Sequence, residues 1–200
     1  MTRSLKLVAL VGVLTLALAG GALASKVTGG TSTLTASDAT VKVLADNHIT
    51  VTPVAPATAS GATFTFPITG GRLNTKTMHG VVRNGGGISV SNGTKTVTLR
   101  RPTIVADKRG VSVWAIVRGR TARICRHLGR RHVRVRCALI ARLHSVRIAR
   151  VSGVSVNGST ATGTAKITAF TAHLINRLAG KHVVAAQDVL GTATVSPTVK

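Results

Sequence analysis

The chain of 200 residues contains no glutamate and no tyrosine, and its acidic side chains are limited to four aspartates. These are Asp38, Asp46, Asp107 and Asp188, which are spread along the chain, so a hydrolase built on two converging carboxylates is not expected. The sequence also lacks the Gly-x-Ser-x-Gly nucleophile elbow, the Gly-x-x-x-x-Gly-Lys-Ser/Thr phosphate loop and the His-Glu-x-x-His zinc motif. We therefore predict that the protein is not an enzyme.

Aromatic residues are scarce as well, with three phenylalanines and one tryptophan, Trp114. Single-stranded nucleic acids stack their bases on aromatic side chains, and the arginine-rich part of this chain has none beside it. Sequence-specific recognition of nucleic acid is therefore not expected. Trp114 itself is interpreted as filler of the core or between sheets, with a platform for a ligand as the alternative.

Basic residues dominate the charge, with 27 Lys and Arg and a formal net charge of +23. More than half of them lie between Arg100 and Arg150, a stretch with a single acidic residue, Asp107. Alternation of valine and arginine over 133–136 places arginines on one face of a strand, because side chains alternate across a strand. That face is either a solvated edge hairpin, whose charge blocks edge pairing, or a surface for polyanions such as wall polymers, membrane headgroups or nucleic acid. The candidate polyanion-binding residues are Arg118, Arg120, Arg123, Arg126, Arg130, Arg131, Arg134 and Arg136.

The chain has two cysteines, Cys125 and Cys137. A hairpin in which residues 117–125 return through Arg130-Arg131 to residues 133–139 would bring them opposite each other. In an exported protein this predicts a disulfide, because compartments outside the cytoplasm are oxidising. His127 and His132 lie between the cysteines, but the surrounding arginines would repel a cation, so no metal site is predicted.

The first 24 residues have the pattern of a secretory signal peptide. Arg3 and Lys6 give a basic start, residues 7–18 are apolar and uncharged, and Ala22-Leu23-Ala24 has the form of a cleavage site. An uncleaved membrane anchor is the alternative, although the apolar run is short for a bilayer span of about 20 residues. Residues 25–40, rich in Thr, Ser and Gly, are then expected to form a flexible spacer, and residues 41–200 one folded domain. We expect a protein that is secreted or associated with the cell envelope.

Alternation of apolar and polar residues predicts an all-β domain. The clearest run is Phe64 to Thr69, and shorter runs lie at 41–43, 49–51, 80–83, 88–90, 97–99, 103–106, 111–117, 154–156, 160–167, 183–186 and 192–195. Asn92-Gly93 and Asn157-Gly158 are hairpin signals, and a type I′ turn at the first would pair Ser91 with Thr94 and Ile88 with Val97. Only residues 169–179 have helical spacing, with Phe170, Leu174, Ile175 and Leu178 on one face. The expected fold is an antiparallel two-sheet β-sandwich with one late helix.

Seven histidines remain as candidate ligands: His48, His79, His127, His132, His144, His173 and His182. An isolated histidine is more often an ordinary surface or core residue than a ligand. His79 and His173 are preferred because they flank the central strands.

Three stretches carry a resemblance to a known family. These are residues 64–71 (Phe-Thr-Phe-Pro-Ile-Thr-Gly-Gly), residues 80–88 (Gly-Val-Val-Arg-Asn-Gly-Gly-Gly-Ile) and residues 97–102 (Val-Thr-Leu-Arg-Arg-Pro). Together with the late helix and the closing run Gly191-Thr-Ala-Thr-Val195, they resemble the HtaA-type domain of actinobacterial exported and cell-surface proteins, over about Val41 to Val195. The resemblance implies a β-sandwich that binds haem and passes it on.

The sequence departs from that family at the ligands. The family coordinates haem iron with a tyrosine supported by a histidine, but this chain has no tyrosine, and Asn84-Gly85-Gly86-Gly87 stands where the family has a histidine-containing turn. Haem thus remains a candidate ligand without assigned residues, although a histidine could hold its iron and arginines its propionates. The hypothesis is an exported, non-enzymatic binding or structural module of the cell envelope. The alternative is a cationic adhesion module, whose binding should weaken steeply with salt.

Overall fold

The structure is a computed structural model that describes residues 24–119, 123–126, 136–139 and 143–200. The signal-peptide prediction falls on residues 1–24 and so lies almost entirely outside the described residues. The described elements, in chain order, are β1 (Ser25–Ala36), α1 (Asp38–Asp46), β2 (Thr50–Val54), β3 (Thr58–Ser60), β4 (Thr63–Leu73), β5 (Gly80–Asn84), β6 (Gly87–Ser91), β7 (Thr96–Asp107), β8 (Gly110–Gly119), β9 (Arg123–Arg126), β10 (Arg136–Leu139), β11 (Leu143–Asn157), β12 (Thr160–Ile167), α2 (Ala169–Ala179) and β13 (Val189–Val199).

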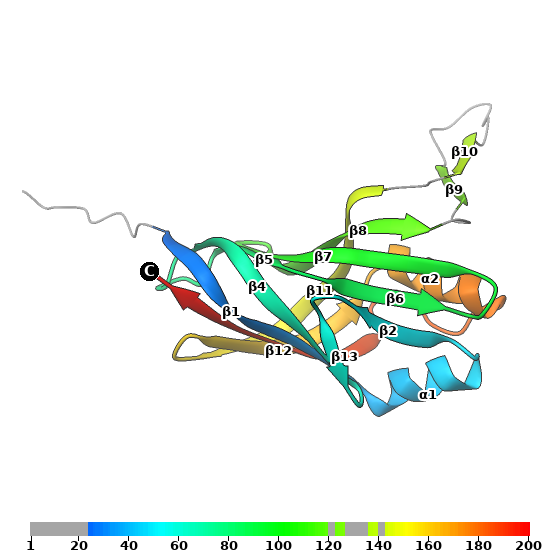
Figure 1. The fold of residues 1–200 in the computed structure, drawn as a ribbon, viewed down its shortest axis with the longest axis horizontal. Helices are drawn as coiled ribbons and strands as arrows, with labels where there is room; N and C mark the ends of the chain where they lie inside the picture. The colour runs from blue at the N-terminus through cyan, green and yellow to red at the C-terminus, as the bar shows by residue number, and fades with distance from the viewer. Residues whose placement is uncertain (1–23, 120–122, 127–135, 140–142) are drawn as a thin grey trace, which may run out of the picture.

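Eight antiparallel strands close into a barrel (Figure 1). Their order is β7-β5-β4-β1-β13-β12-β11-β8, and β8 pairs again with β7, from Val97 opposite Gly119 to Asp107 opposite Gly110. The fold is all-β as predicted, but the two-sheet sandwich is wrong. The sheet closes because β7 pairs on one side with β5 and β6 and on the other with β8. Strand β6 carries β2 at its outer side, and β3 pairs with β4.

The expected spacer over 25–40 is also wrong, because it forms β1 and the start of α1. Strand β1 lies between β4 and β13 and pairs with both. Val27, only 1% exposed, is among the most buried side chains of the protein. Gly30 lies so close to β13 that a Cβ there would overlap the carbonyl oxygen of Ser196. Gly30 therefore allows β1 to approach β13 closely.

A second helix, α1, replaces the strand expected at 41–43. Its N-cap is Ser37, whose hydroxyl accepts a hydrogen bond from the N–H of Thr40 at 3.3 Å. Asn47 ends the helix, and its side-chain amide donates to the carbonyl of Val43 at 2.7 Å. The alternation of Val41 and Val43 was too short to distinguish a strand from a helix.

The predicted helix over 169–179 is confirmed as α2. Thr168 caps its start and Gly180, in the left-handed conformation, follows its end. The strand expected at 183–186 is wrong: the side chain of Asn176 instead accepts hydrogen bonds from the N–H groups of Val183 and Val184. The backbone of this segment is thus hydrogen-bonded to a side chain of α2 instead of to a neighbouring strand.

The hairpin at Asn157-Gly158 is confirmed, with Asn157 opposite Thr160. The register predicted at Asn92-Gly93 is wrong, because Ser91 pairs with Thr96 and Ile88 with Leu99. The Oδ1 atom of Asn92 accepts hydrogen bonds from the N–H groups of Thr94 and Lys95, so four residues instead of two form the turn.

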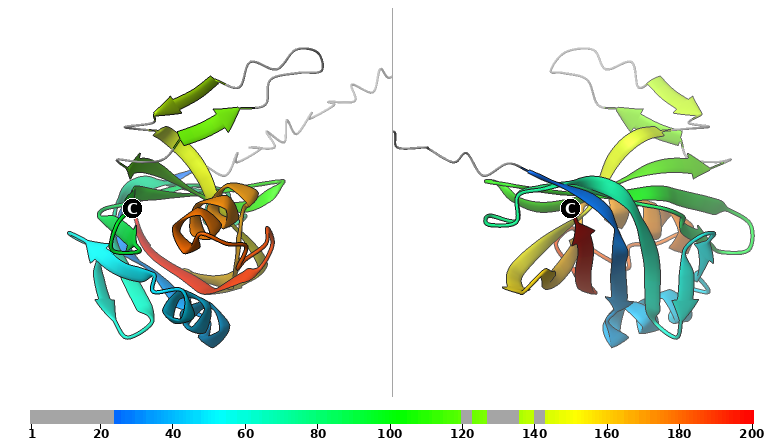
Figure 2. Two further views of the ribbon diagram at one scale, coloured as in Figure 1. Left: turned by 90° about the vertical axis from the view of Figure 1, so that its right-hand side faces the viewer. Right: turned by 60° about the vertical axis from the view of Figure 1, so that its left-hand side comes forward.

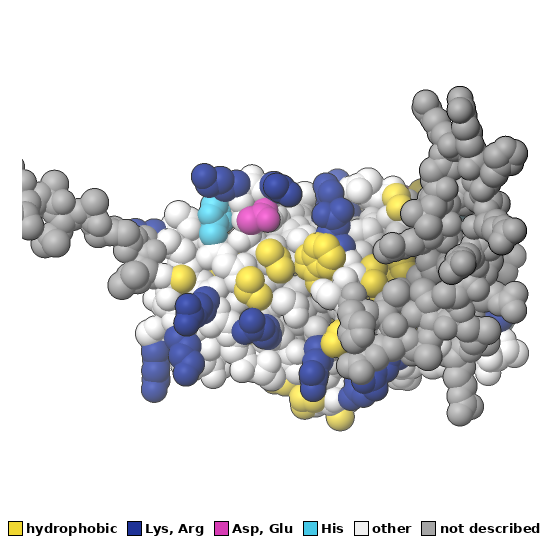
Figure 3. All heavy atoms as spheres, turned by 90° about the horizontal axis from the view of Figure 1, so that it is seen from above, with side chains coloured by type: hydrophobic (Ala, Val, Ile, Leu, Met, Phe, Trp, Pro, Cys, Tyr) yellow, Lys and Arg dark blue, Asp and Glu magenta, His cyan; other side chains and the backbone are white. Residues whose placement is uncertain are grey.

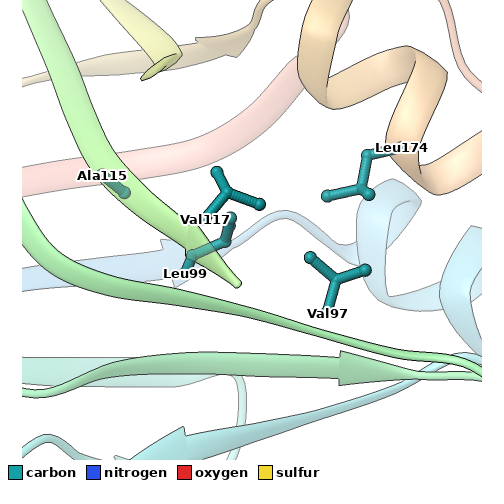
Figure 4. Close-up of a cluster of buried hydrophobic side chains, with 5 residues drawn as sticks. All are labelled: Val97, Leu99, Ala115, Val117 and Leu174. Carbon is teal, nitrogen blue, oxygen red and sulfur yellow. The ribbon is translucent and has the colours of Figure 1, made fainter. Parts of the chain in front are cut away.

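Helix α2 lies across one end of the barrel (Figure 2). Its Leu174 packs against Val97 and Leu99 of β7 and Val117 of β8, as Figure 4 shows. A second buried cluster, around Val27, Ile68, Leu73 and Val82, fills the region where β1, β4 and β5 meet. The core is thus the inside of the barrel together with the inner face of α2.

Strands β9 and β10 form a separate two-stranded ladder in which Cys125 lies opposite Cys137. The register is the predicted one. The cysteine side chains lie outside what the structure describes, so the disulfide stays a prediction. In the described part of the chain, no helix is both long and apolar enough to cross a membrane.

Candidate functional site

The preferred histidines do not form a site. His79 is exposed just before β5, and His173 is exposed on α2, between the buried residues Ala172 and Leu174. Neither lines the two apolar cavities inside the barrel or the two larger hollows on its surface. The structure therefore gives no support to this pair.

The arginine-rich hairpin is described only in part. Arg118 is exposed at the end of β8. Arg120, Arg130, Arg131 and Arg134 lie outside the described residues, and so do the side chains of Arg123, Arg126 and Arg136. The polyanion surface thus stays a prediction.

Inside the barrel, two apolar cavities of about 80 and 100 Å³ lie along the packed side chains. Sites for small molecules and cofactors usually measure about 300–1,000 Å³. Where these described side chains line it, the interior of the barrel is therefore packed as a core.

A larger hollow lies between α1, the adjoining strands and α2, and we call it the α1 groove. Its volume is about 520 Å³, and most of its lining side chains are apolar. Strands β1, β2, β4 and β6 form its floor, while Val41 and Leu44 of α1 and Ile175 of α2 border it. This is the size and polarity expected of a pocket for a largely apolar ligand.

Helix α1 borders the groove without sealing it. None of its residues is buried, and Val41 is 42% exposed, which is unusual for a large apolar side chain on a helix face turned toward the core. A ligand that covered the exposed apolar surface of α1 would remove it from water, which favours binding.

The polar atoms around the groove are mostly engaged. The hydroxyl of Thr40 donates to the carbonyl of Val189 at 3.0 Å, and that of Thr50 donates to the carbonyl of Ser91 at 3.3 Å. Of the lining residues, His48 alone has a ring nitrogen that can ligate a metal. His48 follows α1 in the left-handed conformation (φ 51°), and its backbone N–H donates to Ala45.

His48 is not one of the two histidines preferred from the sequence, although the residues before it carry a signal. Val41, Leu44 and Ala45 have the spacing i, i+3 and i+4 of one helix face, and His48 follows two residues after the last residue of the helix. A helical interpretation of 38–46 would have placed His48 just beyond the end of that apolar face. Over the described residues, no group of three or more His, Cys, Asp or Glu side chains is arranged to hold a metal ion by itself.

Trp114 lies half-buried on the outer face of β8, not between two sheets. Its Nε1–H donates to the hydroxyl of Ser112 at 3.1 Å, and the guanidinium carbon of Arg147 lies 5.7 Å from the ring centroid. It lines a cleft separate from the α1 groove.

Comparisons with known proteins bear on the fold. A scan against protein families found no match, and neither did a search of curated proteins. Among solved structures, the chain is similar to the C-terminal domain of HtaA from Corynebacterium glutamicum, with a TM-score of 0.58 and 12% identity, over 88% of this chain and 99% of that one. The N-terminal domain of HtaA gives a TM-score of 0.58 at 13% identity, over 86% and 98% of the two chains. The haem-binding protein HtaB from the same organism gives 0.54 at 14% identity, over 88% and 96%. The chain thus has an HtaA-type fold, as the sequence resemblance indicated.

Proposed function

We propose that the protein is an exported, non-enzymatic binding module of the cell envelope and that the α1 groove binds haem. The observation that carries the proposal is the groove itself, about 520 Å³ and mostly apolar, beside a helix with no buried residue. Export rests on the signal-peptide pattern of residues 1–24. Binding of haem by HtaB, which has the same fold, supports the choice of ligand.

The residues that line the groove suit haem, because they combine apolar side chains with one histidine that can ligate iron. The apolar side chains of α1, β4 and β6 would pack against the macrocycle, and His48 would ligate the iron, as histidine does in globins and peroxidases. Among the described residues no arginine lines the groove, so the propionates would lie toward solvent. The missing tyrosine therefore excludes the family's usual ligand but not a histidine-bound haem.

The test is an absorbance titration of the chain starting at Ser25 with haemin, at low and at high salt. We expect a Soret shift that saturates at one equivalent in both. His48→Ala should weaken binding about tenfold or more, or about 1.4 kcal/mol, and alter the Soret band, because the ligand to the iron is lost. His79→Ala and His173→Ala are matched controls and should leave the spectrum unchanged.

A second pair of variants tests the groove without touching the ligand. Val41→Glu places a charge against the apolar lining, whereas Val156→Glu changes a comparably exposed valine, 50% against 42% exposed, outside the groove. Only the first should abolish haem binding. Binding that disappears at high salt, or that both glutamates weaken equally, would mean that the positive charge merely collects propionates.

A further inference from the structure

A second hollow, which we call the arginine cleft, lies on the outer face of β5, β7 and β8. Its volume is about 630 Å³, and it shares no lining residue with the α1 groove. Arg83, Arg100 and Arg101 line it together with Trp114 and Ser145. Seen from above, the molecule shows many Lys and Arg side chains around a small hydrophobic group, with few acidic ones (Figure 3).

The arginines of the cleft have no acidic partner. The chain has only four aspartates, and none lines the cleft. Asp46 is paired with Lys42 at 3.1 Å, Asp107 accepts a hydrogen bond from the N–H of Arg109, and Asp188 accepts one from the N–H of Ala185. The fourth, Asp38, lies in the first turn of α1. Three guanidinium groups therefore line one hollow without a counter-charge from the protein, which favours an anion there.

A bulge in β7 brings two consecutive arginines to the cleft. Neighbouring residues of a regular strand point to opposite faces, but the register of β7 against β8 shifts between Arg100 and Thr103. Arg101 has a positive φ of 50°, and its N–H donates to the carbonyl of Gly86 at 2.8 Å. The next residue, Pro102, is buried. The bulge thus turns both side chains outward.

A second residue in the same uncommon conformation lies across the cleft. Ser145, on β11, has φ 48° and is exposed. Non-glycine residues in this region are uncommon and cluster at binding sites, where the surrounding structure maintains the strain. Two of the five described non-glycine residues with positive φ line this one cleft.

Trp114 supplies a flat apolar wall. Its N–H is already bound to Ser112, and the guanidinium carbon of Arg147 lies 5.7 Å from the ring centroid. The part of the ring that lines the cleft therefore offers apolar surface rather than a donor. We propose that the arginine cleft binds a small aromatic oxyanion, a phosphate or carboxylate, whose charged group is held by the guanidiniums and whose ring packs against Trp114.

The test exploits the fact that Trp114 is the only tryptophan and that tyrosine is absent, so intrinsic fluorescence reports on the cleft alone. The chain starting at Ser25 would be titrated with phenyl phosphate, benzoate, inorganic phosphate and phenol, with calorimetry in parallel. We expect a saturable fluorescence change with one of the two aromatic anions, at least tenfold weaker binding of inorganic phosphate, and no binding of phenol. The stronger of phenyl phosphate and benzoate identifies the kind of oxyanion.

Variants that each remove one positive charge distinguish binding in the cleft from non-specific attraction of anions by the positive net charge of the protein. Arg83→Gln and Arg100→Gln should weaken binding about tenfold or more, whereas Arg72→Gln, an exposed arginine of β4 outside the cleft, should change it less than twofold. Equal weakening by all three, or inorganic phosphate binding as well as the aromatic anions, would overturn the proposal. His48→Ala should not affect this titration. A negative result for the arginine cleft would therefore leave the haem proposal untouched, and a negative haem titration would leave the cleft proposal untouched.

Discussion

Asn84 connects three strands of the barrel from its interior. It is 3% exposed; its Oδ1 atom accepts a hydrogen bond from the hydroxyl of Ser32 on β1 at 2.8 Å, and its Nδ2 donates to the carbonyl of Pro102 on β7 at 3.0 Å. Both the oxygen and the nitrogen of this buried side-chain amide therefore have a hydrogen-bond partner inside the apolar core. Such a group stabilises the fold only while its partners remain.

We expect Asn84→Ala to lower the free energy of unfolding by about 2–3 kcal/mol, because it leaves the Ser32 hydroxyl and the Pro102 carbonyl buried and unpaired. Ser32→Ala should lower the free energy of unfolding by about 1–2 kcal/mol. The double variant should lose less than the sum of the two single losses, since Ser32 and Asn84 share one hydrogen bond. Urea unfolding measures these values, with Ser155→Ala, an exposed serine of β11, as control. Strict additivity would contradict the coupling.

Among the elements, β1 shows how adjacent glycines can play different roles. Gly29 has no other atom within 4 Å of a Cβ built on it, whereas Gly30 has φ +109° and lies against β13. The strand therefore requires glycine at only one of the two positions.

Gly30→Ala should destabilise the protein by at least about 1 kcal/mol, because alanine is strained at that φ and its Cβ would push β13 away. Gly29→Ala should be neutral or stabilise by up to about 1 kcal/mol, through the lower entropy of the unfolded chain. Thermal and urea unfolding of the pair measure the difference. Similar losses for both would show that β1 needs its glycines for another reason.

At the scale of the whole molecule, the closed sheet depends on β1, the first strand of the described residues. Removing β1 would leave β4 and β13 with unpaired edges and expose the cluster around Val27. A chain starting at Ser37 should therefore fail to show cooperative urea unfolding by circular dichroism, whereas one starting at Ser25 should show it. Cooperative unfolding of the shorter chain would contradict this dependence.

Much of the local structure could be predicted from the sequence. Two elements are observed as predicted. Helix α2 follows from its four apolar residues at helical spacing, and the β11–β12 hairpin follows from Asn157-Gly158 between alternating runs. The first candidate site was missed for a local reason: the start of α1 was interpreted as a strand, so the apolar face of the helix, and the position of His48 just after it, were not recognised. The register at Asn92 was missed because that side chain binds two backbone N–H groups of its own turn.

The sequence by itself determined the all-β class, the late helix, the resemblance to HtaA-type domains and the excess of positive charge. Each depends on periodicity, on a short motif or on composition, all of which are local in the chain. Only the tertiary structure decided that the sheet closes, that β1 belongs to it, and that α1 borders a groove while β7 turns two arginines into a cleft. These features depend on pairing between distant segments, such as Ser32 with Phe66 and with Val195, and no local pattern encodes such pairing.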